Sequence, residues 1–179
     1  PPGVGKGTQA KIIKDKLQIA HISTGELLRQ EIAEKTEVGM VAKEYIDQGK
    51  LVPDNFLFTI VNERLGKPDC RNGYILDGFP RTLNQANGLE KIMDSFNHSL
   101  DRAISLYADE DALVERLVKR GENSGRSDDT SNIIRNRQKI YWQQTAPLLD
   151  FYKERSLLDN VNGLGEIKEI TERILAVMK

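Results

Sequence analysis

A glycine-rich segment near the start of the chain has the residue types of a phosphate-binding loop. It reads Gly3-Val4-Gly5-Lys6-Gly7-Thr8 and stands directly before a helical pattern. Backbone N–H groups of such a turn and the positive end of the next helix can bind phosphate oxygens, and a lysine adds charge. The pattern G-x-x-x-x-G-K-[ST] is not fully met, because Gly7 takes the Ser/Thr position and the first glycine would precede Pro1. The alternative interpretation is a turn with a solvated lysine.

A second candidate group is the carboxylate of Asp77, which follows the apolar run Tyr74-Ile75-Leu76. An acid at the end of a buried strand is typical of P-loop nucleotidases, where it faces the bound metal directly or through water. Alone, this pattern fits an aspartate that caps the next turn equally well. Together with Lys6, it favours a metal–nucleotide site at the carboxyl edge of a parallel sheet.

Arginines form the third group of candidates. Phosphoryl transfer spreads negative charge over several oxygens, and planar guanidinium groups match that geometry. Most surface arginines are simply solvated, and Arg135 fits that description, whereas Arg126 lies in the flexible stretch Ser124-Gly125-Arg126. We expect several arginines to converge on phosphates. The candidates are Arg29, Arg81, Arg116, Arg120, Arg126 and Arg137.

Helical and strand patterns alternate along the chain, which predicts βαβ units and a parallel sheet with helices on both faces. Ser23 and Glu26 have capping-box spacing, Gly49 suits the position after a helix, and Pro147 is expected to bend the longest helix. His21 is expected to pack or to cap. The expected helices cover residues 8–17, 23–33, 38–48, 53–65, 82–96, 109–121, 131–155 and 166–178. The expected strands cover residues 18–22, 74–77, 102–108 and 157–161.

Two segments fit this α/β core poorly, namely residues 23–52 and residues 121–130. Both are expected to be mobile inserts above the carboxyl edge of the sheet, where ligands bind in open α/β folds. A glycine-rich phosphate loop normally follows a buried strand, and no strand stands before Pro1. We therefore expect the natural chain to carry roughly five to ten more residues, mostly apolar, ahead of Pro1.

The composition narrows the classes of function. The 26 Lys and Arg residues nearly balance 27 Asp and Glu residues, which argues against a general binder of nucleic acids or membrane surfaces. The single cysteine, Cys70, excludes a disulfide framework and a multi-cysteine zinc site. A length of 179 residues suits one domain. The sequence has no long apolar run and no signal peptide, so we expect a soluble, cytoplasmic protein.

Taken in order, these motifs resemble the adenylate kinase family, in its short-lid form among the nucleoside monophosphate kinases. The resemblance covers essentially the whole chain and rests on residues 3–9, 21–29, 49–53, 76–82, 120–129 and 145–147. It implies a P-loop kinase fold in a single domain over residues 1–179, with a parallel five-stranded sheet and helices on both faces. A monophosphate-binding insert would cover residues 23–52 and a short lid residues 121–130. The first strand of that sheet would be missing from this sequence.

The resemblance also implies which residues hold the ligands. ATP would bind Gly3, Val4, Gly5, Lys6, Gly7, Thr8, Arg120 and Gly165. AMP would bind Thr24, Arg29, Lys50, Leu51, Val52, Gly78, Phe79, Pro80, Arg81, Gln85, Arg126 and Arg137. The catalytic cations would be Lys6, Arg81, Arg116, Arg120, Arg126 and Arg137, and Asp128 and Asp129 would orient the lid arginines. Mg²⁺ would accompany ATP with Asp77 near its waters. No structural zinc is implied, because the lid lacks cysteine.

The implied reaction is the reversible, Mg-dependent transfer ATP + AMP = 2 ADP, which maintains adenine nucleotide balance. We expect a monomer whose partners are small nucleotides, without nucleic acid or membrane. Three alternatives stay open: a UMP/CMP kinase, a non-catalytic nucleotide sensor, and a P-loop ATPase associated with nucleic acid. Thr24 and Gln85 bear on the first alternative. The amide of Gln85 can donate and accept hydrogen bonds at once, which suits binding to adenine. The retained cations argue against the second alternative, and the balanced charge against the third.

Overall fold

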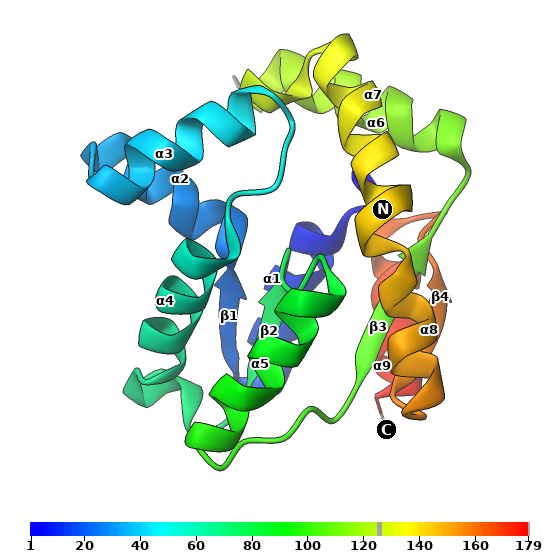
Figure 1. Ribbon diagram of the computed structural model, residues 1–179. Coiled ribbons are helices and arrows are strands. Elements are labelled where there is room, and N and C mark those ends of the chain that lie inside the picture. Colours follow the sequence, from blue (N-terminus) through cyan, green and yellow to red (C-terminus); the bar gives the residue numbers. More distant parts are fainter. Residues whose placement is uncertain (125–126, 179) are drawn as a thin grey trace.

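The computed structural model describes residues 1–124 and 127–178, and its helices surround short parallel strands (Figure 1). The helices are α1 (Lys6–Leu17), α2 (Thr24–Glu34), α3 (Glu37–Asp47), α4 (Asp54–Leu65), α5 (Leu83–Ser95), α6 (Glu110–Ser124), α7 (Ser131–Ile140), α8 (Pro147–Glu154) and α9 (Ile167–Val177). The strands are β1 (Ala20–Ser23), β2 (Tyr74–Asp77), β3 (Ala103–Tyr107) and β4 (Leu158–Asn162). Single turns lie at η1 (Pro68–Cys70), η2 (Ser127–Asp129) and the π-helical η3 (Tyr141–Thr145). None of the described helices is long and apolar enough to cross a membrane.

Several helix ends follow the local signals in the sequence. The Oγ of Ser23 accepts a hydrogen bond from the backbone N–H of Glu26 at 3.4 Å, which caps α2. The Oγ1 of Thr82 accepts one from the N–H of Gln85 at 3.1 Å, which caps α5. Gly49 follows α3 with a φ of +67°, a left-handed conformation that suits glycine after a helix. The expected ends of these helices are therefore confirmed.

Two expected boundaries were wrong. Helix α6 continues through Gly121 to Ser124, so the first part of the expected lid is helical. A Cβ at position 121 would lie 2.8 Å from the carbonyl oxygen of Asp129, so Gly121 permits the close approach of η2 and does not end the helix. The helix expected over residues 131–155 is interrupted by the π turn η3, and Pro147 begins α8.

The strands form two separate parallel pairs. β1 pairs with β2, which places Ser23 opposite Asp77 at their carboxyl ends. β3 pairs with β4, which places Tyr107 opposite Asn162. In the described residues β2 and β3 do not pair with each other, so the expected continuous five-stranded sheet is not confirmed.

A cavity of about 1370 Å³ reaches from the glycine-rich loop into the space between β2 and β3. Its deeper wall is apolar, with Ile75 from β2, Ile104 and Leu106 from β3, and Ile13 from α1. In the described residues this apolar space lies between the two strand pairs.

Each strand pair belongs to its own apolar core. One core joins β1 and β2 to α2, α4 and α5 through residues such as Ile22, Val61 and Leu89. The other joins β3 and β4 to α1 and α9 and contains Val4 and Ile13. Burial of each such side chain stabilises the fold by about 1.5–3 kcal/mol. Because Val4 belongs to this second core, against which Ile75 of β2 also packs, the glycine-rich loop is anchored beside both strand pairs.

Candidate functional site

The glycine-rich loop enters α1 with backbone groups open to the large cavity. Gly3 and Gly5 have φ values of +86° and +96°, which favour glycine. A Cβ on Gly3 would lie 2.6 Å from the carbonyl oxygen of Leu113, so the loop packs directly on α6. Among the described residues, no side chain caps the amino end of α1. Its first N–H groups are therefore available to an anion such as phosphate.

Lys6 is the first residue of α1 and faces the same cavity. Its Nζ donates a hydrogen bond to the carbonyl oxygen of Pro1 at 2.6 Å. Desolvation inside the cavity lowers the pKa of Lys6 to about 8; Asp77 opposes this shift and the nearby arginines reinforce it. Lys6 is thus one of several cations that a bound anion would stabilise.

Asp77 lies at the carboxyl end of β2 beside the loop. Its Oδ2 is 3.7 Å from the Nε2 of the buried His21 on β1. Burial alone would raise the pKa of Asp77, but the His21 imidazole and the charge of Lys6 outweigh this effect and hold the pKa below its usual range. A Cβ on Gly7 would lie 3.2 Å from Oδ2, so glycine at this position leaves room above the carboxylate. An ionised carboxylate with open space beside it can accept hydrogen bonds from the water shell of Mg²⁺.

Arg81 is held at three points by uncharged groups. Its Nε donates to the carbonyl oxygen of Gly78 at 2.7 Å. Its backbone N–H donates to the Oε1 of Gln85 at 2.7 Å, and its backbone oxygen accepts from the Oγ1 of Thr145 at 2.8 Å. Burial, followed by the charge of Arg137, lowers the pKa of Arg81. The bond to Gly78 holds the guanidinium and the other two contacts hold the backbone, while the carboxylates of Asp77 and Asp128 offset part of the charge without pairing directly with Arg81.

A smaller cavity of about 60 Å³ also has Arg81 in its wall. Thr24 contributes to this wall, and its Oγ1 donates to the carbonyl oxygen of Gly78 at 3.0 Å. The residues expected to bind AMP that line it are Thr24, Arg29, Lys50, Leu51, Val52, Gly78 and Arg81. The structure thus brings most of the expected AMP-binding residues together around one hollow.

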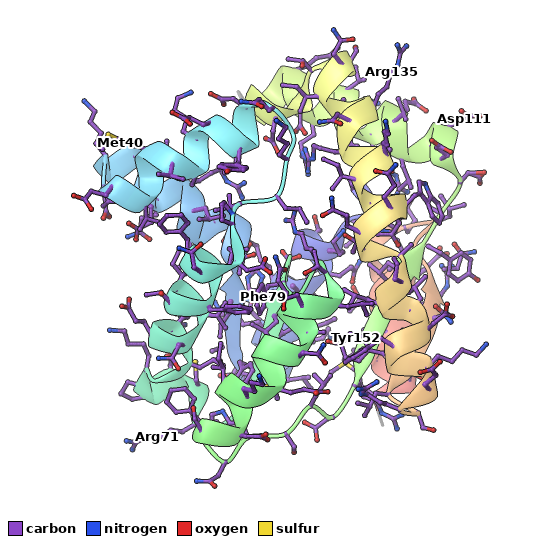
Figure 2. All side chains as sticks on the ribbon, in the orientation of Figure 1. Met40, Arg71, Phe79, Asp111, Arg135 and Tyr152 are labelled. Carbon is purple, nitrogen blue, oxygen red and sulfur yellow. The ribbon has the colours of Figure 1, made fainter. Side chains whose placement is uncertain are left out.

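Phe79 and Pro80 line the large cavity instead of the small one. Phe79 is almost fully buried, and its ring meets that of Phe58 edge-on, with the ring centroids 6.2 Å apart. Figure 2 shows Phe79 between helices α4 and α5. Its packing role is therefore plain, and its contact with AMP stays a prediction.

Gln85 differs from the open base-binding amide that the sequence suggests. The residue is fully buried and lines neither cavity. Its Oε1 accepts from the N–H of Arg81, and its Nε2 donates to the Oδ1 of Asp54 at 2.8 Å. One acceptor position and one N–H of the amide remain for a ligand. Contact with adenine stays a prediction and requires that Gln85 be uncovered.

The lid carboxylates and arginines form one ion-pair cluster. The Nε and Nη2 of Arg120 donate to the two carboxylate oxygens of Asp129 at 2.6 and 2.7 Å. The Nη1 of Arg137 lies 2.8 Å from an oxygen of Asp129 and 2.8 Å from the Oδ2 of Asp128. Desolvation opposes the ionisation of Arg120, but its bond to Asp129 raises the pKa overall. Arg126, expected to join this cluster, lies outside the described residues.

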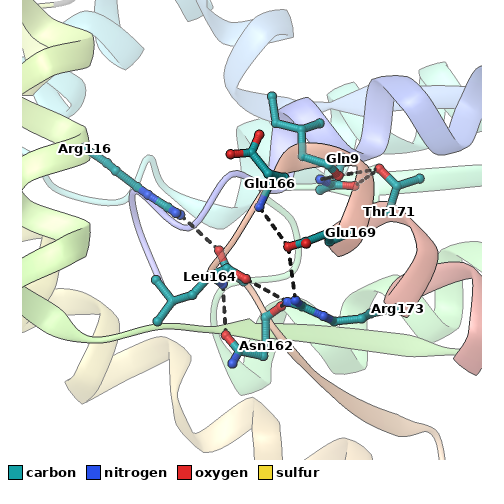
Figure 3. A network of polar contacts seen from close by, with 10 residues as sticks. Gln9, Arg116, Asn162, Leu164, Glu166, Glu169, Thr171 and Arg173 are labelled. Carbon is teal, nitrogen blue, oxygen red and sulfur yellow. Dashed lines mark hydrogen bonds and ion pairs between the residues drawn. The ribbon is translucent and has the colours of Figure 1, made fainter.

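Arg116 and Arg135 lie away from this cluster. The Nη1 of Arg116 donates to the carbonyl oxygen of Gly163 at 3.1 Å, in the loop between β4 and α9 (Figure 3). Gly165 lies in the same loop, which Arg173 holds by donating to the carbonyl oxygen of Leu164 at 2.7 Å. Arg116 is thus placed on the side of the expected ATP-adenine contact, and its role at the transferring phosphoryl stays a prediction. Arg135 is exposed in the middle of α7, as expected (Figure 2).

Three side chains gain a place in the site that the sequence did not assign. Thr145 contacts Arg81 from the π turn, and Asp54 contacts Gln85 from the start of α4. His21, expected only to pack or to cap, lies beside Asp77. The sequence marks Thr145 only through its motif with Pro147, and it marks Asp54 only as a helix start. Neither signal identifies the contact partner.

Comparison with known proteins adds independent evidence. A family model described as adenylate kinase matches residues 1–157. The chain belongs to the adenylate kinase family. It is 48% identical to an adenylate kinase of Stenotrophomonas maltophilia (strain K279a), over 100% of this chain and 96% of that protein. It is 48% identical to one of Leptospira biflexa over 98% and 94%, and 44% identical to one of Nocardioides sp. over 99% and 93%.

Membership of the adenylate kinase family makes the protein a kinase, a nucleotide-binding transferase whose family has a role in nucleotide biosynthesis. The described α/β arrangement agrees with this membership, with parallel strands and a glycine-rich loop at the start of α1. Among residues 1–124 and 127–178, no group of three or more His, Cys, Asp or Glu side chains could hold a metal ion.

Proposed function

We propose that the protein catalyses ATP + AMP = 2 ADP by direct transfer between two nucleotides. One observation supports this proposal: the cations Arg29, Lys50 and Arg81 line both the cavity at the glycine-rich loop and the small cavity at the insert. Of these, Arg81 has its guanidinium held by the carbonyl oxygen of Gly78, so it can contact phosphates from both sides. Two neighbouring cavities with shared cations suit a reaction in which donor and acceptor are both phosphorylated.

The donor phosphates would lie on the glycine-rich loop, against the N–H groups of α1 and the ammonium of Lys6. The acceptor phosphate would lie against Arg81 and Arg29 in the small cavity. The acceptor is itself a phosphate oxygen, so no side chain has to remove a proton. Catalysis then rests on positioning the two phosphates and on opposing the charge that develops between them.

The small cavity has to widen before it can hold AMP. Its volume is about 60 Å³, whereas ligand pockets usually measure about 300–1000 Å³. Its wall includes residues from α2, from the end of the insert and from the loop after β2, so a shift of the insert would enlarge it. Closure over bound nucleotides by the insert and the lid would exclude water, which could otherwise accept the phosphoryl group.

The site also fits a magnesium ion that arrives with ATP. The observation that supports the fit is the ionised Asp77 beside Gly7, where an added Cβ would crowd the carboxylate oxygen. Asp77 would hold waters of the ion, while phosphate oxygens supply its other ligands. When bound, Mg²⁺ neutralises part of the phosphate charge. No structural zinc is part of this proposal.

On the lid side, Arg120 and Arg137 would turn toward the transferring phosphoryl while Asp128 and Asp129 keep them oriented. Arg126, outside the described residues, would join them in the closed state. Arg116 and Gly165 would lie on the adenine side of ATP. We infer that the protein acts as a monomer in the cytoplasm, which light scattering and cell fractionation would test.

We further infer that the working enzyme has a continuous five-stranded sheet with one more strand between β2 and β3. The apolar cavity between these strands supports this, because a parallel strand there would bond to both free edges. An apolar extension of about six residues at the amino end should raise the melting temperature. An unchanged melting temperature would contradict this inference.

A coupled assay of ADP formation with MgATP tests the proposed reaction, using AMP, UMP, CMP and GMP in turn as acceptors. We expect kcat/KM for AMP to exceed that for UMP and CMP by at least about two orders of magnitude, the scale on which a polar site rejects a mismatched base. Comparable values for AMP and UMP would favour the UMP/CMP kinase alternative, and no transfer at all would favour a nucleotide sensor.

A further inference from the structure

The amide of Gln85 has only one favourable orientation in this structure. Its oxygen faces a donor, the backbone N–H of Arg81, at 2.7 Å. Its nitrogen faces an acceptor, the Oδ1 of Asp54, at 2.8 Å. If the two ends were exchanged, the NH₂ group would face an N–H and the oxygen would face a carboxylate, so both contacts would become repulsive. Full burial leaves no water to compensate for that loss.

Asp54 is well placed to fix this orientation. It is the first residue of α4 and directly follows the segment of residues 50–53, part of which walls the small cavity. Its second oxygen, Oδ2, accepts from the Nδ2 of Asn84, the neighbour of Gln85 at the start of α5. Asp54 is half-buried and held from two residues, so its carboxylate does not rotate freely.

The orientation of an amide decides which purine it can recognise. Adenine presents an amino donor at position 6 and an acceptor at N1. Hypoxanthine presents an acceptor and a donor at the same two atoms. An amide fixed with its oxygen and nitrogen in set places can therefore pair with one base and meet like groups on the other.

We propose that Asp54 is a specificity-determining residue that fixes the Gln85 amide in the orientation that accepts a 6-amino purine and rejects a 6-oxo purine. This inference rests on the proposed function, in which AMP is the acceptor and Gln85 meets its base. Asp54 itself acts through Gln85 as a positioning residue and does not touch the nucleotide. The nucleotide rejected on this account is IMP, which differs from AMP only at N1 and position 6.

The test compares AMP and IMP as acceptors in the parent protein and in Asp54→Asn. The Asn side chain has a similar shape, but its amide can present either a donor or an acceptor to Gln85, so the fixed orientation is loosened. We expect the ratio of kcat/KM for AMP to that for IMP to be at least about 100 in the parent and to fall about tenfold or more in the variant. Most of the change should come from improved use of IMP.

The matched control is Asn84→Ala, which removes the other contact of Asp54 and leaves the bond to Gln85. Its AMP-to-IMP ratio should stay within about twofold of the parent, the range of a change that removes no base contact. Equilibrium binding of AMP and IMP without ATP gives the same ratio without turnover. If Asp54→Asn does not fold, Asp54→Ala is measured in the same way.

The outcomes separate this inference from the proposed function. If the parent prefers AMP but Asp54→Asn lowers activity with both nucleotides equally, Asp54 has only a structural role and the inference is wrong. If the parent does not prefer AMP over UMP, the proposed function fails first. A ratio that falls equally in Asp54→Asn and Asn84→Ala would also overturn the inference, because it would trace the effect to the start of α5 in general.

Discussion

Arg81 and the lid arginines carry the same functional group in opposite electrostatic surroundings. Arg81 bonds to a carbonyl oxygen, its backbone is held by an amide and a hydroxyl, and among the described residues it forms no direct ion pair. Arg120 forms a two-bond ion pair with the fully buried carboxylate of Asp129. Accordingly, the pKa of Arg81 is lowered by burial, whereas that of Arg120 is raised through its hydrogen bonds to Asp129.

This difference indicates how each group meets a phosphate. A guanidinium whose hydrogen-bond partner is neutral gains most when a dianion arrives, because only the more distant carboxylates of Asp77 and Asp128 offset its desolvated charge. An arginine that is already paired gains less, because the phosphate has to compete with the carboxylate partner for the same guanidinium. We infer that Arg81 is the permanent cation of the site. Arg120 and Arg137 would act when the lid brings them to the transferring group.

The largest expected effect is that of Arg81→Ala. Loss of the fixed cation should reduce kcat/KM with AMP by about 10²–10³-fold, since it removes a preorganised charged donor. Arg81→Lys is the control, because it keeps the charge but loses the planar fork that bonds to Gly78; it should fall between the parent and the alanine variant. If kcat/KM fell less than tenfold in Arg81→Ala, Arg81 would not be the main fixed cation of the site.

A smaller effect is expected for Asp129→Asn. The substitution leaves Arg120 and Arg137 without their shared buried partner, so both kcat and the melting temperature should fall, kcat by about 10–100-fold. Asp69→Asn is the matched control, since Asp69 pairs with Arg64 at an exposed position where ion pairs contribute under about 1 kcal/mol. If Asp129→Asn and Asp69→Asn lowered the melting temperature equally, the buried ion pairs of Asp129 would contribute no more to stability than the exposed pair of Asp69.

The ionisation of Lys6 predicts a pH effect of intermediate size. Its pKa is lowered to about 8, so the free protein carries the ammonium below that pH and loses it as the pH rises through about 8. The affinity for ATP should therefore fall above pH 8, by up to about tenfold per pH unit. Calorimetric titration at pH 7 to 9.5 measures this effect. Lys6→Arg stays charged and should abolish the slope; a slope that persists in Lys6→Arg would assign it to another group.

The smallest effect is expected for Thr145→Val. This change removes the hydroxyl that donates to the backbone oxygen of Arg81 and leaves that oxygen without this partner. One such hydrogen bond contributes about 1 kcal/mol, so kcat/KM should fall roughly fivefold. Thr145→Ser keeps the hydroxyl and should restore most of the activity. An equal loss in Thr145→Ser, which keeps the hydroxyl, would contradict the assignment of the effect to this hydrogen bond.

Much of the fold could be predicted because the signals are local. Ser23 and Gly49 mark helix ends through a side chain or the backbone, and the structure confirms both. The predicted helix end at Gly121 was wrong because the role of this glycine is not local: it makes room for Asp129, eight residues further along the chain. The pairing of strands also depends on distant segments, and in the described residues β2 and β3 do not pair.

The candidate site shows the same division. The glycine-rich loop, Asp77 and the arginines can be found from residue type and spacing, and most of the expected acceptor residues share one hollow. The contacts that orient them join residues far apart, such as Thr145 with Arg81 and Asp54 with Gln85. No pattern in the sequence marks such pairs. The burial of Gln85 could not be foreseen for the same reason, since the chain segments that cover it are distant in sequence.

Separate calorimetric titrations of ATP and of AMP into three proteins test the central claim most directly: the parent, Arg81→Ala and Arg120→Ala. If Arg81 is a fixed cation between two sites, Arg81→Ala should weaken the binding of both nucleotides, each by about tenfold or more, as the loss of a charged hydrogen bond implies. Arg120→Ala should weaken only ATP, because its guanidinium is paired with the lid residue Asp129 and is expected on the ATP side of the site. Unchanged binding of either nucleotide to Arg81→Ala would contradict the claim that one guanidinium lies between donor and acceptor.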